Sequence, residues 1–187
     1  MPLIKHDRRA TSGTQQIVKA ITNVQETTTH VQPAERALTA TLADAAVTVA
    51  AHARTSTAQS IANAAADVIV VYGTEISDTH NALAAGVFTV PLAGSYAVAA
   101  LATLASAAWA AGGVAELSLY LNGVRIVVLD RQTVTTAATL LVELTGMAVG
   151  IPCIVGDTFD VRISQSSGGA IALQNSTAYN HCGLHRI

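Results

Sequence analysis

The dipeptide Asn122-Gly123 lies between two short apolar runs and is the strongest turn signal in this chain of 187 residues. A two-residue type I′ turn needs positive φ at both central positions, which asparagine and glycine adopt more readily than other residues. The flanking runs, 115–121 and 125–129, have the length and apolar character of strands. The sequence therefore predicts an antiparallel hairpin at this place.

From Asp67 to the end of the chain, short apolar runs alternate with turn residues, and no stretch between them shows helical periodicity. Closely spaced strands with Gly-rich connections are typical of an antiparallel sandwich or barrel. We therefore predict an all-β domain over residues 67–187, with further strands at 68–72, 86–90, 96–104, 140–147, 158–164, 170–173 and 179–187.

Residues 81–115 contain no Asp, Glu, Lys or Arg, which makes a membrane-spanning helix of about 20 residues worth testing. Pro91, Gly94 and Gly112-Gly113 interrupt this run, and its longest unbroken piece, 95–111, is short and mainly alanine. Buried strands of a sandwich explain the run better. We therefore predict no membrane span.

Residues 1–66 differ in composition from the rest and predict an extended, partly helical N-terminal arm. Ile17, Ile21 and Val24 fall at helical spacing, so a short amphipathic helix is expected around them. Alanine and threonine dominate residues 37–66. That composition suits either a helical stalk or a segment extended along a partner, and both interpretations remain open.

The charges are unevenly distributed along the chain. Residues 1–36 carry five basic and three acidic side chains, a net charge of +2, whereas residues 67–187 carry four basic and eight acidic ones, a net charge of −4. We expect the arm to dock on an acidic partner through basic side chains, among them Lys5, Arg8, Arg9 and Lys19. Solvated charge on a flexible terminus is the alternative. The overall charge of −2 argues against nucleic acid as a partner.

Residues with metal-binding side chains occur near the C-terminus, at His181, Cys182 and His185. On a strand the two histidines would lie roughly 13 Å apart at ~3.3 Å per residue, too far for one tetrahedral ion within a subunit. Only a threefold axis could gather one histidine from each of three copies. The hydrolase motifs Ser-x-x-Lys, Gly-x-Ser-x-Gly and His-Glu-x-x-His are absent from the sequence. We therefore expect no enzyme, no cofactor and no metal ion.

Three aspartates, Asp130, Asp157 and Asp160, are candidates for a calcium site. Calcium takes six to eight oxygen ligands, and the sequence shows no dense acidic loop to supply them. Turn chemistry is the better interpretation of Asp157.

Two cysteines do not make a disulfide framework in a chain of this length, so Cys153 and Cys182 are expected to be buried thiols. The first residues lack a continuous apolar leader, which predicts a protein made in a reducing cytoplasm. Trp109 precedes Gly112-Gly113 and either caps the core or contacts a partner from a loop.

The stretch from Phe88 to Tyr96 resembles a motif of the globular heads of complement components and of the wider complement and tumour necrosis factor superfamily of jelly rolls. The family pattern Phe-x-x-Pro-x-x-Gly-x-Tyr is met by Phe88, Pro91, Gly94 and Tyr96. Alanine and leucine stand where family members usually place core and trimer-axis aromatics.

Three later motifs follow in the family's order. Asn122-Gly123 approximates the family's Leu-x-x-Asn-Gly hairpin, and Gly156-Asp157 precedes a late strand as it does in the family. Gly183 lies in the closing strand, where the family usually has aromatic-Ser-Gly-aromatic. The resemblance covers residues 67–187 and implies an antiparallel jelly-roll sandwich that assembles as a homotrimer, with the inner sheets packed around a threefold axis.

Similar heads occur on virus and bacteriophage structural proteins as well as on secreted animal proteins. Together with the missing leader and the unpaired cysteines, this favours a bacteriophage virion protein, assembled in the host cytoplasm. We expect a capsid decoration or cement protein on the capsid surface, whose arm binds the major capsid protein or another virion protein. The alternative is the receptor-binding head of a fibre or tail protein that recognises host surface glycans.

Overall fold

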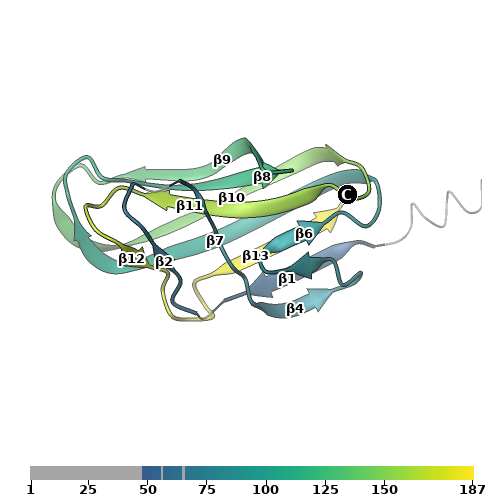
Figure 1. Cartoon of the computed structure of the whole chain (residues 1–187), viewed down its shortest axis with the longest axis horizontal. Coiled ribbons are helices and arrows are strands. Elements are labelled where there is room, and N and C mark those ends of the chain that lie inside the picture. The colour runs from purple at the N-terminus through teal and green to yellow at the C-terminus, as the bar shows by residue number, and fades with distance from the viewer. Residues whose placement is uncertain (1–47, 56, 65) are drawn as a thin grey trace, which may run out of the picture. The chain divides into compact units, whose positions relative to one another are not determined.

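Two antiparallel sheets form the main body of the protein (Figure 1), for which a computed structural model describes residues 48–55, 57–64 and 66–187. The five-stranded sheet has the order β10-β7-β13-β1-β4, formed by Ala138–Cys153, Gly94–Trp109, His181–Arg186, Ala50–Arg54 and Thr74–Asp78. The six-stranded sheet has the order β5-β6-β11-β8-β9, formed by Leu83–Ala84, Val87–Thr89, Thr158–Gln165, Val114–Leu121 and Val124–Thr133, and β3 (Val68–Ile69) also pairs with β11. A small third sheet pairs β2 (Ser60–Ile61) with β12 (Ile171–Ala172).

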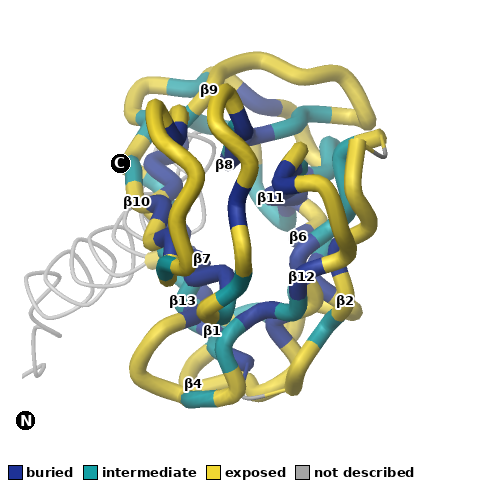
Figure 2. The backbone as a smooth tube through the Cα atoms, turned by 90° about the vertical axis from the view of Figure 1, so that its left-hand side faces the viewer, coloured by how far each residue is buried: buried dark blue, intermediate teal, exposed yellow. Residues whose placement is uncertain are grey.

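The core lies between the two large sheets. Figure 2, which looks along the strands, shows the buried segments between the layers. From β7, Tyr96, Val98 and Leu104 are buried, and Leu117 of β8 and Ile163 of β11 are buried in the other layer. Alternation of inward and outward side chains along each strand follows from the pleat, so each sheet presents one face to the core and one to the outside.

The predicted hairpin is confirmed. Asn122 and Gly123 have φ of 52° and 74° and join β8 to β9, whose residues pair in antiparallel register. The all-β antiparallel architecture is confirmed as well. The predicted strands at 96–104, 125–129 and 140–147 extend further than expected, as β7, β9 and β10.

The domain boundary predicted at Asp67 needs correction, because the compact unit begins at Thr48. Strand β1 lies in the segment assigned to the arm, yet it pairs with β13 on one side and with β4 on the other. In the part of residues 37–66 that the structure describes, β1 and β2 are therefore strands of the sandwich rather than a helical stalk. Strands β4 and β5 were also not predicted. The expected helix near Ile17 and the rest of residues 1–47 lie outside the described residues.

The charge-free run 81–115 forms β5, β6, β7 and the start of β8 rather than a membrane helix. Among the described residues, no helix has the length and apolar character that a membrane span requires.

Candidate interaction surface

The outward face of the five-stranded sheet carries few charges. We call it the apolar face and define it by the outward side chains of four strands: Leu141, Thr145, Met147, Val149, Ala99, Leu101, His181, Gly183, His185 and His52. Met147, Ala99, Gly183 and His52 lie side by side across the sheet in the strand register. Met147 and Val149 are 66% and 61% exposed. Charge on this side of these four strands comes from Glu143 and Arg54, and the other polar groups of the face are Thr145 and the three histidines.

A hollow of about 280 Å³ opens on the apolar face. Small residues explain it: a Cβ atom added to Gly183 would meet no atom within 4 Å. Gly146 brings β10 close to β9, since a Cβ there would lie 2.5 Å from the carbonyl oxygen of Leu129. His52 and His181 line the hollow with their rings stacked, the centroids 5.7 Å apart.

The outward face of the six-stranded sheet is different, because ion pairs cover it. We call it the polar face and define it by Asp67, Glu116, Tyr120, Arg125, Arg131, Asp160 and Arg162. Glu116 contacts Arg125 at 2.6 Å and Arg131 at 3.6 Å, and Arg125 also lies 4.0 Å from Asp67. These contacts satisfy the charges within the subunit.

Arg162 and Tyr120 form the centre of the polar face. The Arg162 guanidinium donates to both carboxylate oxygens of Asp160, at 2.5 and 3.1 Å, and lies 4.0 Å above the ring centroid of Tyr120. The hydrogen bonds to Asp160 raise the pKa of Arg162. Burial, followed by the hydrogen bond that its hydroxyl donates to Asp67, raises the pKa of Tyr120. The charges of this face are therefore fixed partners of one another.

The signature residues of the resemblance hold the fold together. Phe88 and Tyr96 are buried, and the Tyr96 hydroxyl donates to the carbonyl oxygen of Leu92 at 2.6 Å. The ring of Tyr96 lies between those of Phe88 and Phe159, at 6.2 and 6.0 Å. Pro91 lies between β6 and β7, and Gly94 opens β7. These residues position the sheets and form no site.

Two of the motifs meet in space. The side-chain nitrogen Nδ2 of Asn122 donates to Oδ1 of Asp157 at 2.9 Å, and the side-chain oxygen Oδ1 of Asn122 accepts from the backbone N–H of Thr158 at 2.9 Å. Asp157 also accepts from the N–H of Ile154. The hydrogen bond from Asn122, and then that from Ile154, lower the pKa of Asp157. The turn role predicted for Asp157 is therefore confirmed, and Gly156 at φ 91° completes this turn.

The other candidate metal ligands do not come together in one site. Asp160 pairs with Arg162, whereas Asp130 accepts from the N–H of Thr145 at 3.1 Å. His181 and His185 both belong to β13, as the strand prediction required. Across residues 48–55, 57–64 and 66–187, no group of three or more His, Cys, Asp or Glu side chains could hold a metal ion. Lys5, Arg8, Arg9 and Lys19 lie outside the described residues.

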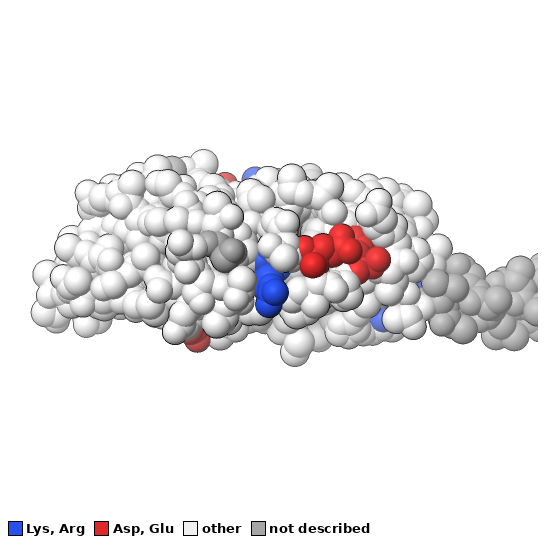
Figure 3. Space-filling view, turned by 90° about the horizontal axis from the view of Figure 1, so that it is seen from below, with Lys and Arg blue, Asp and Glu red and all other residues white. Residues whose placement is uncertain are grey.

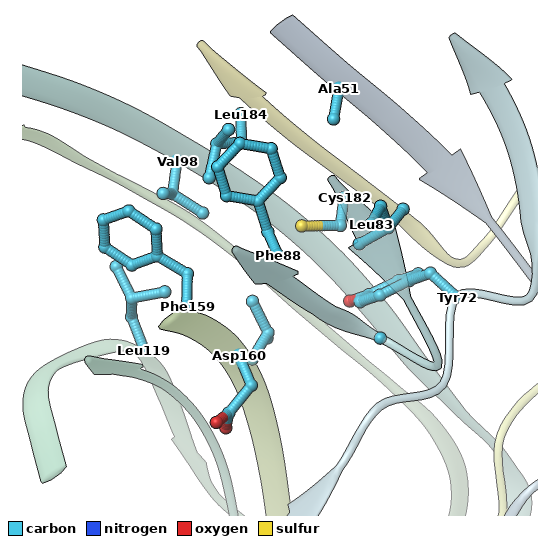
Figure 4. Close-up of a pocket in the computed structure, with 12 residues that line it drawn as sticks. Ala51, Tyr72, Leu83, Phe88, Val98, Leu119, Phe159, Asp160, Cys182 and Leu184 are labelled. Atoms are coloured by element: carbon cyan, nitrogen blue, oxygen red, sulfur yellow. The ribbon is translucent and has the colours of Figure 1, made fainter. Parts of the chain in front are cut away.

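A small cavity inside the sandwich, shown in Figure 4, has a volume of about 20 Å³. That is room for roughly one water molecule. Phe88, Phe159 and Leu184 line it, and the Asp160 carboxylate turns away from it. It is a packing gap and not a ligand site.

The two cysteines and Trp109 lie in or near the core. Cys153 and Cys182 are free thiols, and burial raises their pKa to about 11 and about 12. Trp109 is buried at the end of β7, so it caps the core and is not exposed in a loop.

Figure 3 shows the unit from below, where one patch of acidic side chains lies beside a basic side chain on a surface that is otherwise mostly uncharged.

No protein-family model and no curated protein sequence matches the chain. Its fold is similar to that of Eiger, a tumour necrosis factor from S. frugiperda, with a TM-score of 0.55 and 15% identity over 75% of this chain and 92% of that one. Murine APRIL gives a TM-score of 0.52 and 15% identity over 75% of this chain and all of that one. The globular domain of zebrafish complement 1qA gives 0.47 with 18% identity, over 72% of this chain and 94% of that one. The first two likenesses confirm the expected jelly-roll fold, and at these identities they show the fold alone.

Proposed function

We propose that the chain is a virion structural protein that works as a homotrimer and decorates a capsid, with the apolar face as the contact between subunits. One observation carries the assembly part of this proposal: the apolar face is exposed while the polar face is ion-paired. The mechanism is stabilisation through buried surface, and no reaction is involved.

An antiparallel sheet with one face in water normally alternates apolar and polar side chains. Strand β10 departs from this rule, because Leu141, Met147 and Val149 are exposed while Val142 and Leu144 point into the core. Contiguous exposed apolar surface marks interaction sites. Covering this face with copies of the same chain removes that surface from water.

A closed threefold ring needs two different patches, one on each side of every contact. The apolar face supplies one patch. Strand β9 supplies the second, because Val124, Ile126, Val127 and Val128 are all at least 37% exposed. Exposed apolar side chains gathered on one strand mark an interaction site. Strand β9 of one copy against the apolar face of the next closes a trimer, the assembly that the jelly-roll resemblance implies.

The capsid role is supported by the charge distribution of the sequence. Residues 1–36 carry a net charge of +2 ahead of a body that is acidic. A basic arm on an acidic body suits attachment to an acidic surface. Lys5, Arg8, Arg9 and Lys19 are the proposed anchors.

The test is a truncated chain that lacks residues 1–36. Because the sandwich begins at Thr48, the truncation leaves all its strands intact. We expect the truncated chain to keep the solution mass of a trimer and to fail to co-sediment with capsids from the same source. Unchanged capsid binding would refute the role of the arm, and loss of the trimer would show that the arm, not the apolar face, joins the subunits.

The alternative role is a receptor-binding fibre head. Quantitative mass spectrometry of purified particles separates the two roles, since a decoration protein covers the whole shell and a fibre head is present in few copies.

A further inference from the structure

Two histidines from distant parts of the sequence lie side by side in the hollow of the apolar face. His52 belongs to β1 and His181 to the neighbouring strand β13. Their ring centroids are 5.7 Å apart and their planes differ by 29°. The pairing of β1 with β13 fixes both backbones, so the two rings are held close before any ligand arrives.

Within the described residues, the ring nitrogens of this pair form no hydrogen bond or ion pair. His80 provides a contrast, because its Nδ1 lies 2.8 Å from Oγ1 of Thr79. The nitrogens of His52 and His181 are therefore available to a ligand.

The spacing suits one shared metal ion. With metal–nitrogen bonds of about 2.0–2.1 Å, two imidazoles on a tetrahedral ion have ring centroids roughly 5 Å apart. The observed 5.7 Å between the stacked rings is close to that value, and binding requires a rotation of the side chains that turns one nitrogen of each ring toward the ion. Ala99, Gly146 and Gly183 border the hollow with little bulk, which leaves room for an ion and its further ligands.

We propose that His52 and His181 form a two-histidine site for a divalent transition-metal ion such as Zn²⁺, for which imidazole is a preferred ligand. Water or a group from another molecule fills the remaining positions of the ion. This site is a different pair from His181 and His185, and both of its histidines come from one subunit. Arg54 lies opposite His181 in the strand register, so a like charge weakens the binding.

The test uses the full chain without a polyhistidine tag, freed of metal by a chelator and titrated with ZnCl₂ at pH 7.5 in a calorimeter. His52→Ala and His181→Ala should each weaken Zn²⁺ binding at least about tenfold, since even outer groups of a metal site contribute about that much. His185→Ala is the matched control on the same strand and face, and it should bind as the unaltered chain does.

A second measurement does not rely on the single variants. With one equivalent of Cu²⁺, the electron paramagnetic resonance spectrum should show coupling to two imidazole nitrogens, which the double variant loses. Circular dichroism checks that every variant is folded, and light scattering with and without Zn²⁺ separates ion binding from assembly. Equal Zn²⁺ affinity in folded His52→Ala, or a Cu²⁺ spectrum unchanged in the double variant, would overturn the proposal.

Discussion

The apolar face and the polar face belong to two sheets of one sandwich, yet they differ in how their outward side chains are paired within the subunit. On the polar face Glu116 is bound by Arg125, and Asp160 by Arg162, so the charges have partners inside the subunit. On the apolar face Met147 and Val149 are exposed and the His52 and His181 rings stack on each other. The difference supports the proposal that other subunits cover the apolar face.

The largest expected effect is a loss of assembly when a charge enters the apolar face. Gly183→Lys places an ammonium group at its centre, where the backbone leaves open space, so the fold should tolerate it. A buried charge without a partner costs about 3–5 kcal/mol, so self-association should weaken at least about 100-fold. Sedimentation velocity measures the change.

The matched variant is Ser164→Lys, at the corresponding outward position of β11, opposite Glu116. It should leave the association unchanged. If both substitutions dissociate the protein equally, the two faces do not differ as described.

Asp160→Ala should destabilise the subunit without changing its assembly. Asp160 is 6% exposed and accepts two hydrogen bonds from Arg162, so its loss should lower the free energy of unfolding by about 1–3 kcal/mol. Urea denaturation measures the loss, and Asp160→Asn should show a smaller one. A drop in solution mass without a drop in stability would instead place Asp160 in an interface.

Glu116→Gln tests the more exposed pairs of the polar face. Arg125 and Arg131 have side chains that are 49% and 60% exposed, so water screens both contacts. The expected loss is about 0.5–1 kcal/mol and should shrink in high salt. A salt-independent loss would contradict the ionic origin of these contacts.

Asp157 gives the smallest effect, confined to acid. Its pKa is lowered in the folded chain, chiefly by Asn122, so its contribution to stability is present above the ordinary aspartate pKa and is lost as the pH falls through the lowered value. As the pH falls below about 4, the stability of the unaltered chain should therefore fall more steeply than that of Asp157→Asn. Equal slopes of stability against pH for the two proteins would contradict this role of Asp157.

The sequence predicted the parts of the fold that depend on local chemistry. Asn122-Gly123 determines a turn by backbone preference alone, and the prediction was right. Strand β1 was missed because its sequence, Ala-Ala-His-Ala-Arg, has weak strand propensity. Its partner β13 lies more than 120 residues later, and such a pairing leaves no local signal.

The candidate site was harder to predict because it, too, depends on contacts between segments that are distant in the sequence. In β10, apolar residues occur on both faces, as Val142 and Met147 show, so the pattern does not tell which side is the core. His181 was recognised as a candidate ligand, but it was considered with His185 on its own strand. Its neighbour in space is His52, which only the sheet register reveals.

The solution mass of the full chain, measured by light scattering across a range of concentrations, is the sharpest test of the proposed trimer. We expect three times the chain mass of 19.1 kDa at the higher concentrations, falling to a single chain in the Gly183→Lys variant. A mass of 19.1 kDa for the unaltered chain at every concentration would rule the trimer out.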